Sequence, residues 1–232
     1  MRLATMITTA AALLPGVAAF AEAQAADLVP NLRPLKATDI RIVVTSGGRK
    51  LLRFSATNWN NGDGKLELIG KGTDSATNKQ KVYQRVYSSS NTYRDIFAGS
   101  FDWHAAHNHM HFNDFALYDL QSVSNPNSHR YAQKTTYCVM DTNKINGSLP
   151  GAPASAVYET CRASKQGISV GWGDKYGYQL AGQSIDITNL ANGEYYLKIQ
   201  VDPKRRLLEK NESDNTSSRK IRISGTTVTL LN

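Results

Sequence analysis

The chain has 232 residues, of which 41% are hydrophobic and 20% are charged. This length fits one domain, or one domain with a small appendage, and the composition excludes wholesale disorder. The formal net charge of +8 suits either a soluble surface or an acidic partner. Residues 204–206 form the one tight basic run, and three acidic residues follow it closely, which indicates a solvated loop. We therefore expect no nucleic-acid partner.

The first residues in chain order have the pattern of a signal peptide. Residues 3–20 are apolar or small, without a charge after Arg2, and Pro15 interrupts them. The small-residue pattern from Ala23 to Ala25 follows, so we expect residues 1–25 to be removed on export. The alternative is an N-terminal membrane anchor, but the apolar core is short and broken. We predict a secreted, extracellular or periplasmic protein that has no membrane attachment after cleavage.

The remaining chain reads as short strands between turn residues. An extended, proline-containing lead-in covers residues 27–36, and Asn192-Gly193 is a strong hairpin signal between the strands on either side of it. Turn residues separate the predicted strands, which cover residues 40–45, 50–55, 65–69, 81–87, 184–188, 194–201, 220–223 and 226–231. This pattern predicts a mainly β protein: a single antiparallel, sandwich-like domain with long loops, spanning residues 26–232.

Two cysteines and a histidine cluster carry the specific chemistry. Cys138 and Cys161 are the only cysteines, and an oxidising compartment favours a disulfide between them over two free thiols. A loop of that size contributes roughly 3 kcal/mol in the chain-entropy model.

Four of the five histidines fall within residues 104–111. If this segment is a strand, alternation puts His107, His109 and His111 on one face and the residues between them on the other. Three imidazoles on one face predict a metal site, with copper and zinc both compatible. His104 is out of register and is expected to be a neighbour of the site.

The segment FDWHAAHNHMH at residues 101–111 closely resembles the copper-binding segment of lysyl oxidases. The resemblance continues over almost the whole mature chain. Further matching segments, in order, are residues 27–30, 51–54, 61–62, 114–120, 134–142 (KTTYCVMDT), 166–169, 174–177 (DKYG), 183–188, 193–198 and 212–214.

The resemblance implies a copper-dependent amine oxidase. Copper(II) would be held by His107, His109 and His111. Tyr176 would be oxidised to a quinone and joined to the Lys134 amine, which gives the cofactor lysine tyrosylquinone. Primary amines, either peptidyl lysine in a protein or small amines, would be converted to aldehydes with dioxygen, releasing hydrogen peroxide and ammonia.

This chemistry sets requirements on two further groups. The Lys134 amine must be neutral to attack the ring, so the site has to depress its pKa. A base must take the proton from the substrate's α-carbon; Asp174 is the candidate, and His104 is the reserve.

The sequence also departs from the animal enzymes. Ala106, Trp172 and Gly182 stand where the family has cysteines, which leaves open whether the remaining pair follows the animal framework. Residues 142–158 form a longer segment, and a signal segment leading directly into the domain is typical of a microbial secreted form.

Two other functions are compatible with the sequence: a non-catalytic copper-binding β-sandwich, or a wall-binding sandwich that acts through its basic surface. Lys134 and Tyr176 favour the oxidase, because neither alternative requires them.

Overall fold

The computed structural model describes residues 26–77, 79–105, 108–161 and 164–231. The predicted signal segment and His107 lie outside the described residues. The described chain consists of antiparallel strands and one short 3-10 helix, which confirms the predicted mainly β fold. Within these ranges no helix has the length and apolar character needed to cross a membrane.

The elements occur in the following order along the chain. They are β1 (Asp27–Leu28), β2 (Leu32–Pro34), β3 (Thr38–Val44), β4 (Lys50–Asn60), β5 (Leu66–Asp74), β6 (Lys79–Ser88), β7 (Tyr93–His104), β8 (His109–Asn113), β9 (Ala116–Ser122), β10 (His129–Tyr131), β11 (Thr136–Tyr137), β12 (Asn143–Lys144), β13 (Lys165–Ile168), β14 (Trp172–Tyr176), β15 (Ser184–Asp186), β16 (Gly193–Val201), η1 (Glu212–Asp214), β17 (Thr216–Ser224) and β18 (Thr227–Leu230).

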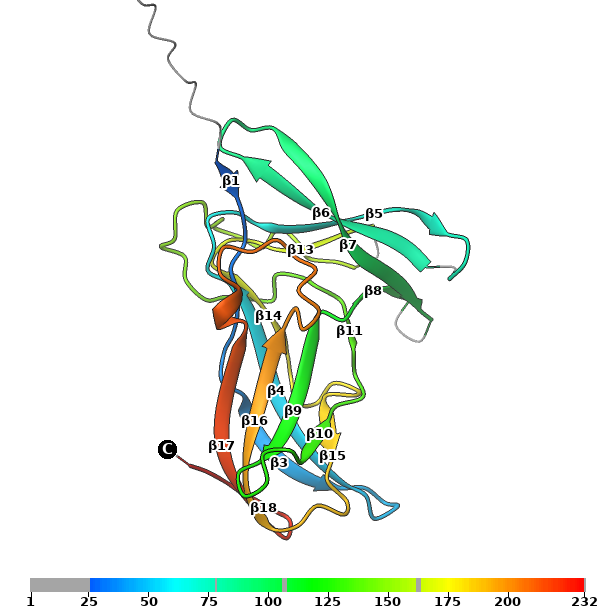
Figure 1. Ribbon diagram of the computed structural model, residues 1–232, viewed down its shortest axis with the longest axis vertical. Coiled ribbons are helices and arrows are strands. Elements are labelled where there is room, and N and C mark those ends of the chain that lie inside the picture. The colour runs from blue at the N-terminus through cyan, green and yellow to red at the C-terminus, as the bar shows by residue number, and fades with distance from the viewer. Residues whose placement is uncertain (1–25, 78, 106–107, 162–163, 232) are drawn as a thin grey trace, which may run out of the picture.

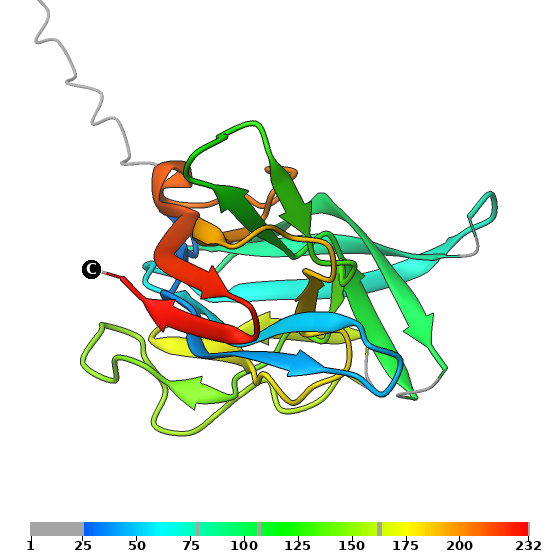
Figure 2. The same cartoon turned by 90° about the horizontal axis from the view of Figure 1, so that it is seen from below.

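The strands form three sheets, two of which build a sandwich (Figure 1). One layer of the sandwich has the order β10-β9-β16-β17-β18, and the other has the order β12-β14-β4-β15, with β2 and β3 also paired to β4. The third sheet, β11-β8-β7-β6-β5-β13, lies across the upper end of this body in Figure 1. Figure 2 looks from below and shows β18 of one layer beside β3 of the other.

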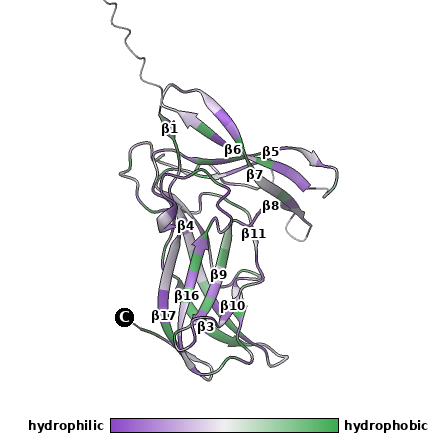
Figure 3. Cartoon of the chain, in the orientation of Figure 1, coloured by the Kyte–Doolittle hydropathy of each residue, from purple (hydrophilic) through white to green (hydrophobic). Residues whose placement is uncertain are grey.

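The sandwich forms because its strands alternate apolar and polar residues, and the apolar faces are removed from water. Figure 3 shows this alternation along β9 and β16. On β16 the buried side chains are Tyr195, Leu197, Ile199 and Val201. Across the core, the ring of Phe54 on β4 meets the ring of Tyr118 on β9 edge-on, with the centroids 5.1 Å apart. Phe54 of this core lies on β4, which pairs with β14, the strand that carries Asp174 and Tyr176.

The predicted hairpin at Asn192-Gly193 is wrong. β15 pairs with β4, whereas β16 pairs with β9 and β17, so the two strands lie in different layers. Ile185 of β15 is fully buried beside Leu52 of β4. This burial outweighs the local preference for a hairpin turn. The side chain of Asn192 accepts a hydrogen bond from the amide of Gly225 instead.

Candidate active site

Two of the three predicted metal-binding histidines lie on β8. The strand begins at His109, because Asn108 has a left-handed backbone (φ 54°) in the preceding turn. The predicted alternation through residue 108 is therefore wrong, although it holds from His109 to His111. The Nε2 atoms of these two histidines are 2.9 Å apart. That separation fits two imidazoles on one ion, since each bond from a metal to an imidazole nitrogen is about 2.0–2.1 Å long.

Neighbouring residues orient the two imidazoles. The hydroxyl of Thr136, on the adjacent strand β11, lies 3.1 Å from Nδ1 of His111. A partner at Nδ1 leaves Nε2 as the metal-facing nitrogen, which is the usual outer-shell arrangement. On the other side, His104 pairs across from His109, and its ring stacks on the ring of His111 at 4.6 Å. His104 is thus adjacent to the cluster, at the end of β7.

Lys134 and Tyr176 lie next to each other. The Nζ atom of Lys134, in the segment between β10 and β11, is 5.2 Å from the centroid of the Tyr176 ring. The Tyr176 hydroxyl donates a 2.7 Å hydrogen bond to the carbonyl of Cys138, which fixes the ring. Tyr137 packs edge-on against the same ring at 5.0 Å, and its own ring centroid is 5.1 Å from the Lys134 Nζ atom.

Asp174 shares the site, since it precedes Tyr176 by two residues on β14 and projects from the same side of the strand. Its side chain is 1% exposed, and its Oδ2 atom has no hydrogen-bond partner among the described residues. Burial raises the pKa of Asp174 well above its ordinary value, although the amide of Met140 and the charge of Lys134 act in the opposite direction.

The environment of Lys134 favours its neutral form. Burial lowers the pKa of this amine, and the opposing charge of Asp174 does not reverse the shift. Burial, followed by the charge of Asp174, also raises the pKa of the Tyr176 hydroxyl well above its usual value. Both shifts favour the uncharged forms, and an uncharged amine is the form that can act as a nucleophile.

A cavity of about 220 Å³ joins these groups. Its walls combine both histidines of β8, the predicted cofactor residues and the predicted base. The lining residues are His109, His111, Lys134, Cys138, Met140, Thr142, Asp174, Lys175, Tyr176, Leu180 and Ala181. The structure thus brings together the predicted site residues that it describes, from segments up to 67 positions apart in the sequence.

The predicted disulfide is present. Cys138 and Cys161 are bonded, and no free cysteine occurs in the described chain. Cys138 directly follows β11 and also lines the cavity, so the bond lies at the edge of the site.

Sequence reasoning did not identify three residues that contact the site: Thr136, Tyr137 and Gln166. The first two lie within the KTTYC segment, where closeness to Lys134 was the available signal. Gln166 is fully buried and connects two segments, and no local pattern indicated this role.

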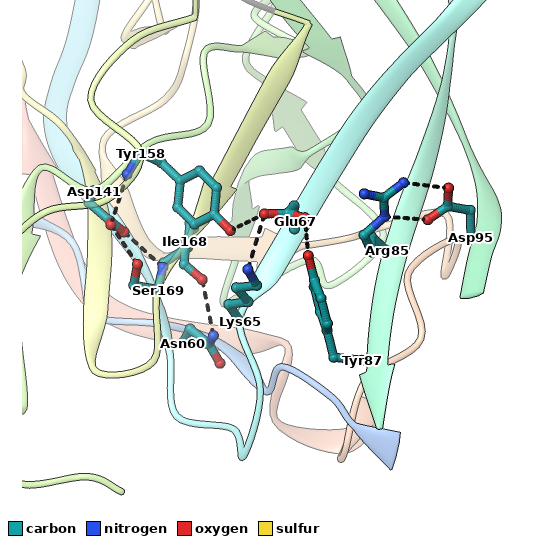
Figure 4. A network of polar contacts seen from close by, with 10 residues as sticks. All are labelled: Asn60, Lys65, Glu67, Arg85, Tyr87, Asp95, Asp141, Tyr158, Ile168 and Ser169. Atoms are coloured by element: carbon teal, nitrogen blue, oxygen red, sulfur yellow. Dashed lines mark hydrogen bonds and ion pairs between the residues drawn. The ribbon is translucent and has the colours of Figure 1, made fainter. Parts of the chain in front are cut away.

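A buried polar network supports the loops around the site (Figure 4). Glu67 accepts 2.8 Å hydrogen bonds from the hydroxyls of Tyr87 and Tyr158. Although burial opposes it, these two hydroxyls lower the pKa of Glu67. Asp141 accepts hydrogen bonds from the amide and hydroxyl of Ser169 and from the amide of Tyr158. The network anchors the long loop before β13 and the turn that leads into β14.

Comparison with known proteins identifies the family of this chain. The lysyl oxidase family model matches residues 84–232. The protein-lysine 6-oxidase of Sus scrofa is 32% identical over 127 residues, which cover 54% of this chain and 48% of that protein. Human lysyl oxidase homolog 1 is 30% identical over 134 residues, which cover 57% of this chain and 22% of that protein.

The match to lysyl oxidase homolog 2 of Gallus gallus is longer, with 27% identity over 199 residues. It covers 85% of this chain and 21% of that protein. The chain spans about half the length, or less, of the curated relatives it matches. Because the family model covers more than half of the chain, this chain belongs to the lysyl oxidase family.

Proposed function

We propose that this protein is a secreted copper amine oxidase, which converts primary amines to aldehydes and releases hydrogen peroxide and ammonia. The observation that carries the proposal is the single cavity lined by His109, His111, Lys134, Asp174 and Tyr176. A protein that only stored or carried copper would need the histidines but not an amine beside a tyrosine ring.

In this proposal copper(II) is held by His109 and His111, whose Nε2 atoms converge, together with His107 from the motif. When bound, copper would activate dioxygen for oxidation of the Tyr176 ring, and the resulting lysine tyrosylquinone would supply the electron sink for amine oxidation.

Lys134 and Tyr176 are the residues that would form the cross-link. The new bond joins the Lys134 Nζ atom to a carbon of the Tyr176 ring. Before that bond forms, one atom of a dioxygen enters the ring, which yields the ortho-quinone of Tyr176 and water. On addition of the amine, one proton from the amine and one from the ring carbon pass to the two ring oxygens. A second dioxygen then takes two electrons and two protons, which restores the quinone and releases hydrogen peroxide. The lowered pKa of Lys134 keeps its lone pair available, and the bond from Tyr176 to the Cys138 carbonyl holds the ring in place.

Asp174 is proposed as the base that takes the proton from the substrate's α-carbon. It lines the same cavity, and one of its carboxylate oxygens has no other hydrogen-bond partner among the residues described. Apolar side chains of Met140, Leu180 and Ala181 complete the wall and limit the access of water.

The proposed substrates are a lysine-containing protein or a small primary amine, with dioxygen as the second substrate. The names of the relatives support the first choice, because one is a protein-lysine 6-oxidase. The predicted signal segment supports export to the extracellular space or the periplasm.

The test is peptide mass spectrometry of copper-loaded, aerated protein. We expect a covalent link between Lys134 and Tyr176, and peroxide release when a primary amine is added. Tyr176→Phe should abolish both, whereas Tyr196→Phe, a matched change on the exposed side of β16, should alter neither. If copper is bound but the wild-type peptides remain separate and unmodified, the protein is a copper-binding member of the family without oxidase activity.

A further inference from the structure

The backbone between the two histidines is held by residues that do not lie on a strand neighbouring β8. Met110 lies between His109 and His111, and its amide and carbonyl are bonded to Cys161, before β13, and to Gln166, on β13 at the far edge of the same sheet. Its amide donates a 3.1 Å hydrogen bond to the carbonyl of Cys161. Its carbonyl accepts a 2.8 Å hydrogen bond from the side chain of Gln166. The position of the histidine pair therefore depends on these two residues.

The same two residues also reach the other half of the site. Cys161 is bonded to Cys138, whose carbonyl accepts the hydrogen bond of the Tyr176 hydroxyl. The side-chain oxygen of Gln166 accepts a 2.9 Å hydrogen bond from the amide of Val139, the residue after Cys138. Two connections, one through the disulfide and one through the Gln166 side chain, thus run from Met110 to Cys138 and Val139, and Cys138 binds the tyrosine hydroxyl.

The two residues next to Met110 are shielded from water: Gln166 is fully buried and Cys161 is 2% exposed. Cys138 is half-buried and lines the cavity. A buried amide that bonds at both ends holds its partners in a defined geometry, because leaving either end unsatisfied would be costly.

We propose that Cys138, Cys161 and Gln166 form a clamp that sets the histidine pair at a fixed distance from Lys134 and Tyr176. These are positioning residues for metal binding and for the cross-link. The inference rests on the proposed function in naming copper and the cross-link. Its physical basis is that a displacement of about 1 Å between reacting groups costs about a hundredfold in rate.

The experiment uses two variants of the full chain: Gln166→Met, which keeps the side-chain length but removes both hydrogen bonds, and Cys138→Ala combined with Cys161→Ala. Two quantities are measured besides the melting temperature: the Cu(II) dissociation constant by competition with a chelator, and the rate of cross-link appearance at saturating Cu(II). We expect about 10- to 100-fold weaker copper binding, the range that outer-shell changes usually produce, and a slower cross-link.

The matched control is Ile223→Ala, a buried position on β17 in the sandwich layer that does not carry the site. It should lower the melting temperature while leaving the copper constant and the cross-link rate at wild-type values. A general loss of stability would therefore not imitate the effect of the clamp. If the double cysteine variant fails to fold, Gln166→Met carries the test alone.

The outcomes separate the two proposals. In the first outcome, the wild-type protein binds copper and forms the cross-link, and the clamp variants do both equally well. This result overturns the clamp but leaves the proposed function intact. Wild-type protein that binds copper but never forms the cross-link overturns the proposed function, and the copper constants of the variants still decide on the clamp. Wild-type protein that binds no copper overturns both.

Discussion

At the residue scale, burial favours the uncharged forms of two groups that the proposed chemistry uses in turn. Burial lowers the pKa of Lys134, which favours the neutral amine that the cross-link requires. Burial raises the pKa of Asp174, so its carboxylate forms at a higher pH than that of an ordinary aspartate. A base with a raised pKa is a stronger proton acceptor at the pH where it ionises, so the same burial serves both steps.

This arrangement predicts the pH dependence of catalysis. Only the carboxylate of Asp174 can accept the proton, so kcat/KM for a small primary amine should rise as the pH passes through the raised pKa. Asp174→Asn should remove that limb and lower kcat by about 100-fold or more, the usual contribution of a positioned base. Steady-state kinetics over a pH series would measure both, using protein whose cross-link has been verified. An unchanged profile in the variant would exclude Asp174 as the base.

At the scale of elements, β6 and β7 form a hairpin, and ion pairs connect its strands. Asp95 on β7 accepts hydrogen bonds from Arg85, and an ion pair from Lys71 reaches it from β5. Despite some burial, the hydrogen bond from Arg85 lowers the pKa of Asp95 to about 2. These contacts of Asp95 join β5, β6 and β7 (Figure 4 shows Arg85 and Asp95). Asp95 lies near the start of β7, and His104 lies at the other end of the same strand.

Asp95→Asn should therefore destabilise the protein in a pH-dependent way. A depressed folded-state pKa contributes stability above the unfolded value of 3.8, and this contribution is lost as the pH falls toward 2. After allowance for solvent screening, we expect a loss of about 1–2 kcal/mol at pH 7. Urea unfolding at pH 7 and at pH 3 would measure the difference between variant and wild type. Asp63→Asn, at an exposed ion pair, should change stability by less than about 0.5 kcal/mol. Equal effects of the two substitutions would contradict the prediction.

At the scale of the whole molecule, metal binding is coupled to stability, because the histidine pair converges only in the folded chain. At a free copper concentration 100 times the dissociation constant, binding adds about 2.7 kcal/mol. For a domain of this size, this corresponds to a rise of about 5–10 °C in melting temperature. Calorimetry with copper and with a chelator would measure it, and the combined variant His109→Ala and His111→Ala should show no rise. A rise that survives in this variant would place the copper elsewhere.

Part of this protein followed from local sequence alone. Alternation of apolar and polar residues indicated the mainly β fold and the segments that form β3 to β6 and β15 to β18, because side-chain periodicity is a property of the strand itself. The long strands β7 and β9 were not among the predicted strands. Residue types and spacing indicated the histidines and the two cysteines, whereas Lys134 and Tyr176 were assigned only through the resemblance to lysyl oxidases. One boundary was wrong: the strand predicted over residues 50–55 is β4, which continues to Asn60.

Tertiary structure decided everything that depends on which strand lies beside which. The Asn192-Gly193 turn signal was overruled because Ile185 is buried against β4, a contact between positions more than 130 residues apart. The cavity, the burial that shifts the pKa values of Lys134 and Asp174, and the bonds of Gln166 arise in the same way, from segments that meet only after folding. A local pattern carries the identity of a side chain, whereas its neighbours, its exposure to water and therefore its reactivity are set by long-range packing.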